Sequence, residues 1–185
     1  MQIAVLGVNH KVAGVNLREL IAKALLRRFS YGEPQVLENA SFVVLSTCNR
    51  SEIYFSSNDL AHTHQEALAI LREEIDCDFE QKCYSFFRKD CLQHLSRVTA
   101  GLDSAVIAET EIQGQVRLAY ELATTARLLP STLHFLFQKA LKIGKEIRTK
   151  FLYQKEIPDI EHAIYAKIKE HFQATKQPML FIGAS

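Results

Sequence analysis

Two strand-like apolar runs separated by a short polar turn constrain this chain more than any other feature of its sequence. Residues 42–45 are mostly β-branched or aromatic, and residues 52–55 alternate polar with apolar side chains, so both runs are expected to be strands. Between them, residues 46–50 carry small, polar and cationic side chains. The sequence therefore places Cys48 in a tight turn where a central strand ends.

Cys48 in this turn is a candidate nucleophile. The sheet would hold the turn, its side chains would face solvent or ligand, and Arg50 lies two residues away, where a positive charge favours the thiolate that attacks carbonyl groups. The alternative is that Cys48 is an inert, small apolar residue, because free cysteines are usually buried. The turn by itself leaves both interpretations open.

The order of the expected elements predicts an α+β fold. Strands over 2–8 and 82–88 and helices over 17–29 and 60–75 combine with the two central strands in the order βαββαβ. This order most economically forms an antiparallel four-stranded sheet with both helices on one face, a ferredoxin-like arrangement. Cys48 then emerges at the carboxyl end of its strand.

The spacing of apolar residues becomes helical from Asp90 onward. A helical region follows directly, and two longer helices are expected over 109–129 and 132–150, with Pro130 between them. These helices are expected to form a small bundle laid against the sheet. Residues 1–150 are thus expected to form one domain.

Residues 151–185 are expected to form a linker, a short helix and one apolar strand that ends in Gly183. A strand ending in glycine is similar to the opening of a Rossmann-type, dinucleotide-binding βαβ unit. We therefore expect this segment to be the truncated start of an NADPH-binding domain, in which Gly183 begins the cofactor motif. The alternative is a terminal edge strand.

Composition narrows the classes of partner and compartment. The net charge is +1, from 22 basic and 21 acidic residues, so a whole-domain field that attracts nucleic acid is not expected. A local basic patch, or an ordinary solvated helix face, is expected from a run of cations on the last long helix. This run comprises Lys139, Lys142, Lys145, Arg148 and Lys150.

The sequence predicts a cytoplasmic protein. No apolar stretch approaches the length of a membrane-spanning helix, and the amino terminus lacks the charged lead and cleavage pattern of a secretion signal. The four cysteines follow no disulfide-framework spacing, which favours reduced thiols. We expect no membrane contact.

Three segments resemble one enzyme family, glutamyl-tRNA reductase. Residues 46–54 (STCNRSEIY) closely resemble its catalytic-cysteine segment, and residues 7–19 are similar to its amino-terminal signature. Residues 94–104, continuing through Glu109 to residues 114–116, are similar to its second substrate-site segment. The resemblance implies an NADPH-dependent oxidoreductase that reduces glutamyl-tRNA to glutamate-1-semialdehyde, the first step of tetrapyrrole (porphyrin and haem) biosynthesis. It also implies a thioester on Cys48.

The same resemblance assigns roles to particular residues. Cys48 and His94 match the family's catalytic positions, with His94 either orienting the substrate or assisting proton transfer to the leaving ribose oxygen. The arginine of the cysteine turn is expected to pair with the carboxylate of the glutamyl group. Substrate contacts are expected from Thr47, Asn49, Arg50, Ser104, Glu109, Thr110, Glu111 and Gln115.

Some residues depart from the family pattern. Residues 108–111 read Ala-Glu-Thr-Glu where the family usually has Gly-Glu-Pro-Gln, so Glu111 changes the local charge and the turn lacks its proline. Val12, Gly14 and Asn16 stand where Thr, Pro and Glu are common. The first difference makes Glu111 a weaker candidate for a substrate contact, whereas the second concerns loop geometry and not the chemistry.

The resemblance further implies glutamyl-tRNA as partner and homodimerisation through a carboxyl-terminal domain outside this chain, and it allows contact with the next enzyme, an aminomutase. Other classes of function remain open. Cys48 and His94 could act as a cysteine-dependent hydrolase that needs no NADPH, and a tRNA-binding module would not need Cys48 at all. A zinc module on Cys77, Cys83, Cys91 and His94 has ligand-like spacing only in its last pair, so no metal site is expected.

Overall fold

The computed structural model describes residues 2–29, 37, 39–105, 109 and 111–152. The expected linker, short helix and terminal strand over 153–185, including Gly183, lie outside the described residues, as does Thr110. The division into domains at residue 150 therefore stays a prediction.

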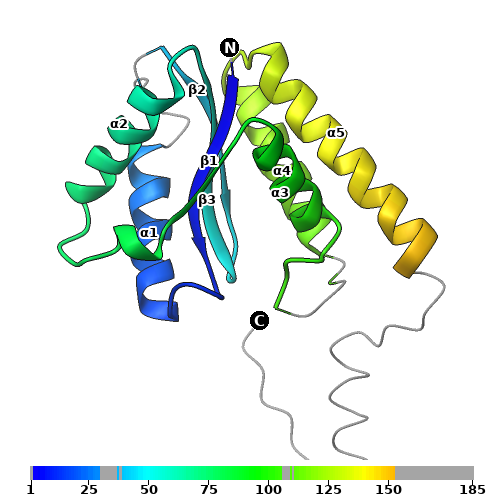
Figure 1. The fold of residues 1–185 in the computed structure, drawn as a ribbon, viewed down its shortest axis with the longest axis horizontal. Helices are drawn as coiled ribbons and strands as arrows, with labels where there is room; N and C mark the ends of the chain where they lie inside the picture. Colours follow the sequence, from blue (N-terminus) through cyan, green and yellow to red (C-terminus); the bar gives the residue numbers. More distant parts are fainter. Residues whose placement is uncertain (1, 30–36, 38, 106–108, 110, 153–185) are drawn as a thin grey trace, which may run out of the picture.

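One antiparallel sheet organises the described part of the chain (Figure 1). Its spatial order is β2-β3-β1-β4, and each neighbouring pair is antiparallel. The strands are β1 (Gln2–Asn9), β2 (Ser41–Ser46), β3 (Arg50–Ser57) and β4 (Tyr84–Phe87). This order, with one helix in each crossover, confirms the predicted ferredoxin-like α+β fold.

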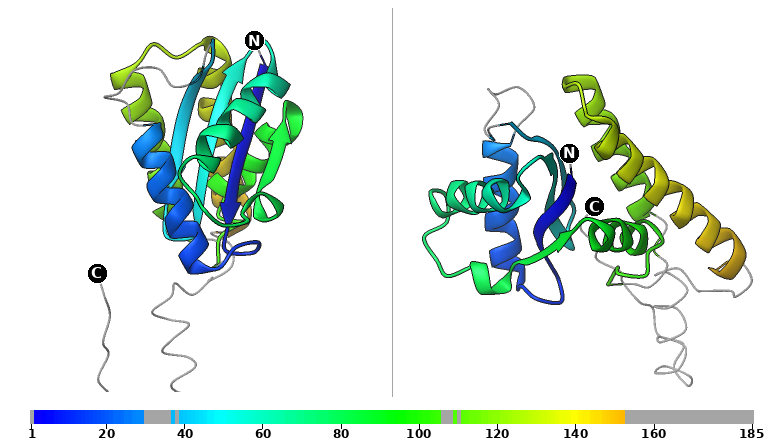
Figure 2. Two further views of the ribbon diagram at one scale, coloured as in Figure 1. Left: turned by 90° about the vertical axis from the view of Figure 1, so that its left-hand side faces the viewer. Right: turned by 45° about the horizontal axis from the view of Figure 1, so that its top comes forward.

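Helices cover both faces of the sheet (Figures 1 and 2). The two crossover helices, α1 (Val15–Arg28) and α2 (Leu60–Arg72), pack on one face as predicted. The bundle on the other face consists of α3 (Lys89–Thr99), α4 (Glu111–Ala126) and α5 (Ser131–Ile147). A short 3-10 turn, η1 (Glu80–Lys82), precedes β4, and a π-helical turn, η2 (Arg148–Leu152), follows α5.

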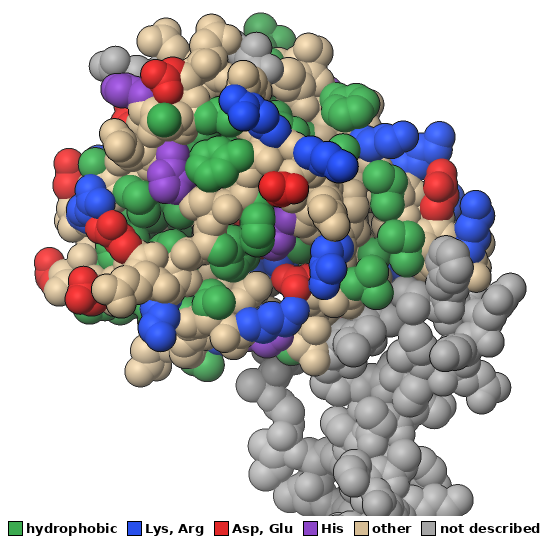
Figure 3. All heavy atoms as spheres, in the orientation of Figure 1, with side chains coloured by type: hydrophobic (Ala, Val, Ile, Leu, Met, Phe, Trp, Pro, Cys, Tyr) green, Lys and Arg blue, Asp and Glu red, His purple; other side chains and the backbone are tan. Residues whose placement is uncertain are grey.

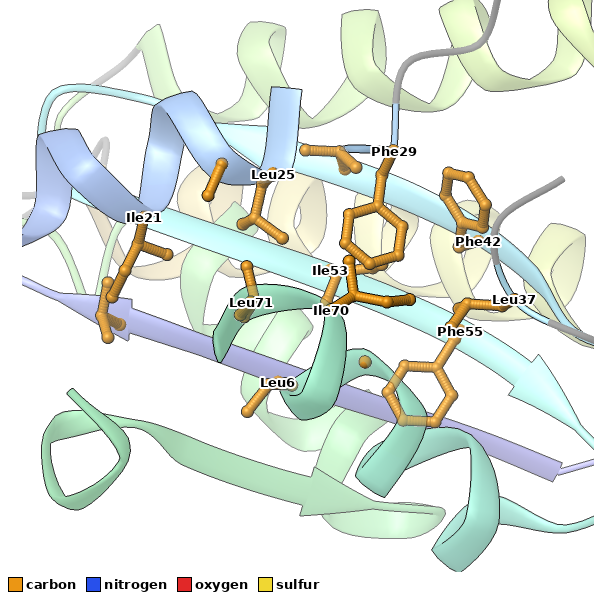
Figure 4. Packing of buried hydrophobic residues seen from close by; sticks show 14 of the residues in the cluster. Leu6, Ile21, Leu25, Phe29, Leu37, Phe42, Ile53, Phe55, Ile70 and Leu71 are labelled. Carbon is orange, nitrogen blue, oxygen red and sulfur yellow. The ribbon is translucent and has the colours of Figure 1, made fainter. Parts of the chain in front are cut away.

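The central strands alternate their side chains between two separate cores. On the side of α1 and α2, Leu6, Ile53 and Phe55 join an aliphatic and aromatic cluster (Figure 4). On the other side, Val5 and Tyr54 join a second cluster built by the bundle. Because both faces are covered, every residue of β3 is buried, including its polar ones.

Several boundaries differ from the predictions. Helix α1 begins at Val15 after Gly14, so Asn16 is not its cap, and Leu20 is 46% exposed, although the apolar spacing predicted it inside. The buried stripe of α1 is narrower than the pattern suggested, because Ile21 and the residues one turn later fill the contact with the sheet. At α2 the predicted cap is confirmed, since the Asp59 side chain accepts a hydrogen bond from the N–H of His62.

The bundle helices and β4 are shorter than predicted. Helix α4 spans Glu111–Ala126 rather than 109–129, and α5 spans Ser131–Ile147 with Pro130 at its N-cap. Ser131 is therefore the first helical residue and not the cap.

Within the described ranges, no helix has both the length and the apolar character needed to cross a membrane.

Candidate active site

Cys48 lies in the turn that joins β2 to β3, and its side chain is exposed. The exposed side chain contradicts the burial on which the alternative of an inert Cys48 rested. The turn is closed by its own residues: the Thr47 N–H donates to the carbonyl oxygen of Arg50 at 2.8 Å. The Thr47 hydroxyl oxygen accepts hydrogen bonds from the N–H groups of Asn49 and Arg50, each at 3.2 Å. The side chain of Thr47 thus shapes the loop that presents the thiol.

The loop between β1 and α1 packs against the cysteine turn. The N–H of His10 donates to the carbonyl oxygen of Asn49 at 2.9 Å. The Arg18 guanidinium donates to the carbonyl oxygens of Ala13 at 2.7 Å and Cys48 at 3.3 Å. Sequence reasoning gave these loop residues no role, although residues 7–19 formed one of the three segments with a family resemblance.

Glu52 is the centre of a buried polar network beneath the turn. The side chain is fully buried in β3, on the face covered by the bundle. One carboxylate oxygen, Oε1, accepts from Arg50 at 2.9 Å, from His94 Nε2 at 2.8 Å and from the Tyr84 hydroxyl. The other, Oε2, accepts from the Tyr54 hydroxyl at 2.6 Å. Sequence reasoning did not find Glu52, because its four donors come from β3, β4 and α3.

The network keeps the Glu52 carboxylate ionised. Burial by itself raises the pKa of Glu52, but the charges of His94 and Arg50 and the hydrogen bonds from His94 and Tyr54 outweigh burial. The pKa of Glu52 therefore lies well below its ordinary range. A fixed negative charge thus lies under the cysteine turn.

Arg50 does not face solvent, which corrects the sequence analysis. Its side chain is 1% exposed, and its guanidinium bridges two acidic residues. Nη1 donates to Glu52, while Nη2 donates to the backbone oxygen of Asp103 at 2.8 Å and to its carboxylate Oδ2 at 3.1 Å. The positive charge of Arg50 is therefore already balanced within the protein. The reason is long-range: residue 103 approaches β3 only once the bundle has packed.

Asp103 links this network to the β1–α1 loop. Its carboxylate pairs with Lys11 and accepts a 3.4 Å hydrogen bond from the side chain of Asn9. Burial raises the pKa of Asp103, but the hydrogen bond from Lys11 and the charge of Arg50 lower it below its ordinary value. The two carboxylates and two cations form a chain of alternating charge from Glu52 to Lys11.

His94 lies at the edge of a cavity of about 530 Å³. Its imidazole is 9% exposed, stacks on Phe86 with ring centroids 4.7 Å apart, and lies 5.3 Å from the ring of Tyr84. The cavity is also lined by Asn9, Lys11, Val12, Tyr84, Phe86, Asp90, Gln93, Arg97 and Asp103. Glu52 holds Nε2 of the imidazole, so a ligand in the cavity would meet a histidine of fixed orientation.

None of the predicted substrate-contact residues that the structure describes is among the residues that line this cavity. Ser104 is buried next to Asp103. Glu109 is half-buried, and its backbone oxygen accepts a hydrogen bond from Arg148. Glu111 is exposed at the start of α4. Gln115 lines a second, largely apolar hollow of about 330 Å³, together with Ser46 of β2.

The structure tests both the predicted basic run, which lies on α5 and η2, and the alternative zinc site. Lys139, Lys142, Lys145 and Lys150 are exposed, whereas Arg148 is buried, so the patch loses one of its members. Figure 3 shows basic and acidic side chains interspersed on one face of the molecule. Among the described residues, no group of three or more His, Cys, Asp or Glu side chains is placed to hold a metal ion.

Comparison with known proteins decides the family. Residues 6–151 match the model of the family described as "Glutamyl-tRNAGlu reductase, N-terminal domain". The chain belongs to the glutamyl-tRNA reductase family. The match contains all three segments whose resemblance suggested the family.

Several curated glutamyl-tRNA reductases are similar to this family member over most or all of its length. The enzyme from Chlamydia abortus is 36% identical over 189 residues, covering 100% of this chain and 54% of the relative. The enzyme from Chlamydia caviae is 37% identical over 194 residues with the same coverage. The enzyme from Akkermansia muciniphila is 40% identical over 159 residues, 81% of this chain and 45% of the relative. The chain thus spans about half the length of these glutamyl-tRNA reductases.

A solved structure supports the fold. The glutamyl-tRNA reductase from Methanopyrus kandleri superposes with a TM-score of 0.65 and 24% sequence identity, covering 91% of this chain and 39% of that one. At this level of sequence identity, the structural similarity shows a shared fold and nothing more.

Proposed function

We propose that the protein to which these residues belong is an NADPH-dependent glutamyl-tRNA reductase that forms glutamate-1-semialdehyde through a thioester on Cys48. The observation that carries this proposal is an exposed cysteine on a turn held by hydrogen bonds. A histidine held in place by Glu52 lines a cavity in the same domain. The family match over residues 6–151 supports it. The product would enter tetrapyrrole biosynthesis.

The described residues would carry the acyl-transfer half of the reaction. The sulfur of Cys48, as thiolate, attacks the ester carbonyl of glutamyl-tRNA, a C–S bond forms, the C–O bond to the ribose breaks, and the ribose oxygen takes up a proton. When bound, NADPH would supply the hydride that converts the thioester to the aldehyde and frees the thiolate. The one residue that the sequence assigns to this cofactor, Gly183, lies outside the described residues.

The burial pattern suggests how the neighbouring residues would contribute. Thr47 and Asn49 shape the turn, and His94 presents an imidazole of fixed orientation to the cavity. A substrate carboxylate that reaches Arg50 would compete with two internal carboxylates, whereas Lys11 is half-exposed at the cavity wall. We further propose substrate contacts from Ser104, Glu109, Thr110, Glu111 and Gln115, as the family resemblance implies.

Mass spectrometry after incubation with glutamyl-tRNA tests the proposal. We expect one glutamyl group on Cys48 and none on Cys77, which is also exposed and serves as the internal control. Cys48→Ser should remove the adduct, and Cys77→Ser should not. An adduct on another cysteine, or no adduct, would contradict the assignment.

The same experiment separates the alternative functions. A cysteine-dependent hydrolase would release free glutamate at every turnover without NADPH, whereas the reductase would hold a thioester that only leaks slowly. A tRNA-binding module would bind glutamyl-tRNA equally well after Cys48→Ser and form no adduct. We propose that the 185-residue chain acylates Cys48 but that semialdehyde formation needs residues beyond it.

Partners and location follow from family membership as further proposals. We propose homodimerisation of the full-length protein through a carboxyl-terminal domain, contact with the aminomutase that consumes the product, and a cytoplasmic location. All four cysteines are free, in keeping with a reducing compartment. Sedimentation of the full-length protein, with and without the aminomutase, tests the two contacts.

A further inference from the structure

The cation in direct contact with the cysteine turn is Arg18, from a segment to which sequence reasoning assigned no role. Its guanidinium reaches from the first turn of α1 to two backbone oxygens, those of Ala13 and Cys48. The second of these contacts joins residues 30 positions apart in the sequence. Arg18 therefore ties the β1–α1 loop to the residue that carries the thiol.

Two hydrogen bonds from the segment that follows β1 reach the backbone of the turn. The hydrogen bonds made by Thr47 close the turn on itself. The carbonyl oxygen of Cys48 accepts from Arg18 of α1, and that of Asn49 accepts from the N–H of His10 in the β1–α1 loop. Only the Arg18 contact is made by a charged donor, and charge-assisted hydrogen bonds are about twice as strong as neutral ones.

The guanidinium of Arg18 is also differently placed from that of Arg50. Arg50 is neutralised by Glu52 and Asp103, whereas no carboxylate pairs with Arg18 among the residues that the structure describes. Its Nε is buried and has no hydrogen-bond partner in that part of the chain. Arg18 is partly buried, and a buried N–H without a partner costs stability, so the two carbonyl contacts are what the guanidinium gains at this position.

We propose that Arg18 is a positioning residue that anchors the carbonyl group of Cys48 to the β1–α1 loop and so fixes the direction from which the sulfur attacks. The inference rests on the proposed acyl transfer to Cys48. A displacement of the reacting atom by about 1 Å can cost roughly 100-fold in rate. Arg18 acts through the backbone and touches no reacting atom.

Single-turnover acylation of Cys48 by glutamyl-tRNA is the test, with Arg18→Gln and Arg18→Lys as variants. Arg18→Gln should lower the rate at saturating glutamyl-tRNA by roughly 10- to 100-fold. The concentration for half-saturation should change by less than about threefold, because ground-state binding is not what the contact provides. Arg18→Lys should recover part of the rate, since lysine keeps the charge but has one ammonium group in place of the two guanidinium nitrogens that donate to the two oxygens.

Arg28→Gln is the matched control. Arg28 lies on the same helix and pairs with Glu73 and Glu74. Within the described ranges it makes no hydrogen bond or ion pair with the turn, so the acylation rate of Arg28→Gln should equal that of the wild type. Alkylation of Cys48 by iodoacetamide gives a second readout, because a small freely diffusing reagent needs no fixed direction of attack. Arg18→Gln should change the alkylation rate far less than the acylation rate.

The outcomes are distinct. Acylation of Arg18→Gln at the wild-type rate, or an equal loss of acylation and alkylation, would overturn the positioning role. If Arg18→Gln does not fold, the partial rate of Arg18→Lys at unchanged half-saturation decides instead. Absence of any adduct on the wild-type protein would refute the proposed function itself, and the role of Arg18 with it.

Discussion

Replacing Glu52 by Gln removes one negative charge from the centre of the buried network while keeping the size of the side chain. In the wild type the carboxylate accepts four hydrogen bonds and pairs with a guanidinium that is 1% exposed. The amide can still accept on its oxygen. Arg50 would then keep only Asp103 as a charged partner, and the NH₂ group of the amide would face the hydroxyl of Tyr54.

The size of the effect follows from burial. Removing one partner of a buried ion pair costs about 3–5 kcal/mol, because the remaining charge is left without compensation in a dry environment. Asp103 partly compensates Arg50, so we expect the lower end of that range for Glu52→Gln, about 3 kcal/mol. With a urea m-value of about 1–3 kcal/mol/M, the unfolding midpoint should fall by at least about 1 M.

Urea unfolding followed by circular dichroism measures this loss. Glu80→Gln is the control, because Glu80 forms an exposed ion pair with Arg72 and exposed pairs contribute little. An equal midpoint for Glu52→Gln and Glu80→Gln would refute the reasoning that the network is a buried, charged unit. A changed m-value would point instead to a different unfolded state.

Three further predictions concern the same part of the molecule. Gly7→Ala should destabilise the protein by about 1–3 kcal/mol in urea unfolding, because a Cβ there would lie 2.6 Å from the backbone oxygen of Ser51 and 2.7 Å from Cγ of Glu52. The free energy of unfolding of the wild type should decrease as the pH falls below the ordinary Glu pKa of 4.5, since the folded-state pKa of Glu52 is lowered. The free energy of unfolding of Glu52→Gln should depend less on pH in this acid range. The same pH dependence in both proteins would contradict the prediction. Iodoacetamide at pH 8 should label Cys48 but not Cys91 in the native protein, because Cys91 is fully buried and burial raises the pKa of its thiol; equal labelling by mass spectrometry would contradict the packing of α3.

The sheet and the cysteine turn could be predicted from the sequence because both depend on local pattern. The apolar runs around Cys48 alternate with turn residues, and the order βαββαβ has one economical packing. Spacing alone was sufficient to place Cys48 in the turn between β2 and β3, but it left open whether the side chain is exposed. The side of the sheet covered by α1 and α2 was predicted for the same reason.

The network under the turn could not be predicted because its members meet only through long-range packing. Glu52 is next to Ile53 in a strand whose pattern equally fits a solvent-facing polar side. Only the packing of α3–α5 turns that side into a core, bringing His94 and Asp103 to β3. The mistaken orientation of Arg50 has the same origin, since the residue that buries it lies 53 positions later in the chain.

The polar network also determines the smallest part of the chain that could keep the cysteine turn in its native surroundings. Its donors and acceptors are spread from Asn9 to Asp103, in segments that no single hairpin or helix contains. A peptide that reproduces only the hairpin around Cys48 would present the same thiol without the buried charges that brace it. Any minimal version of this chemistry must therefore retain the first strand, the fourth strand and the helix that follows it.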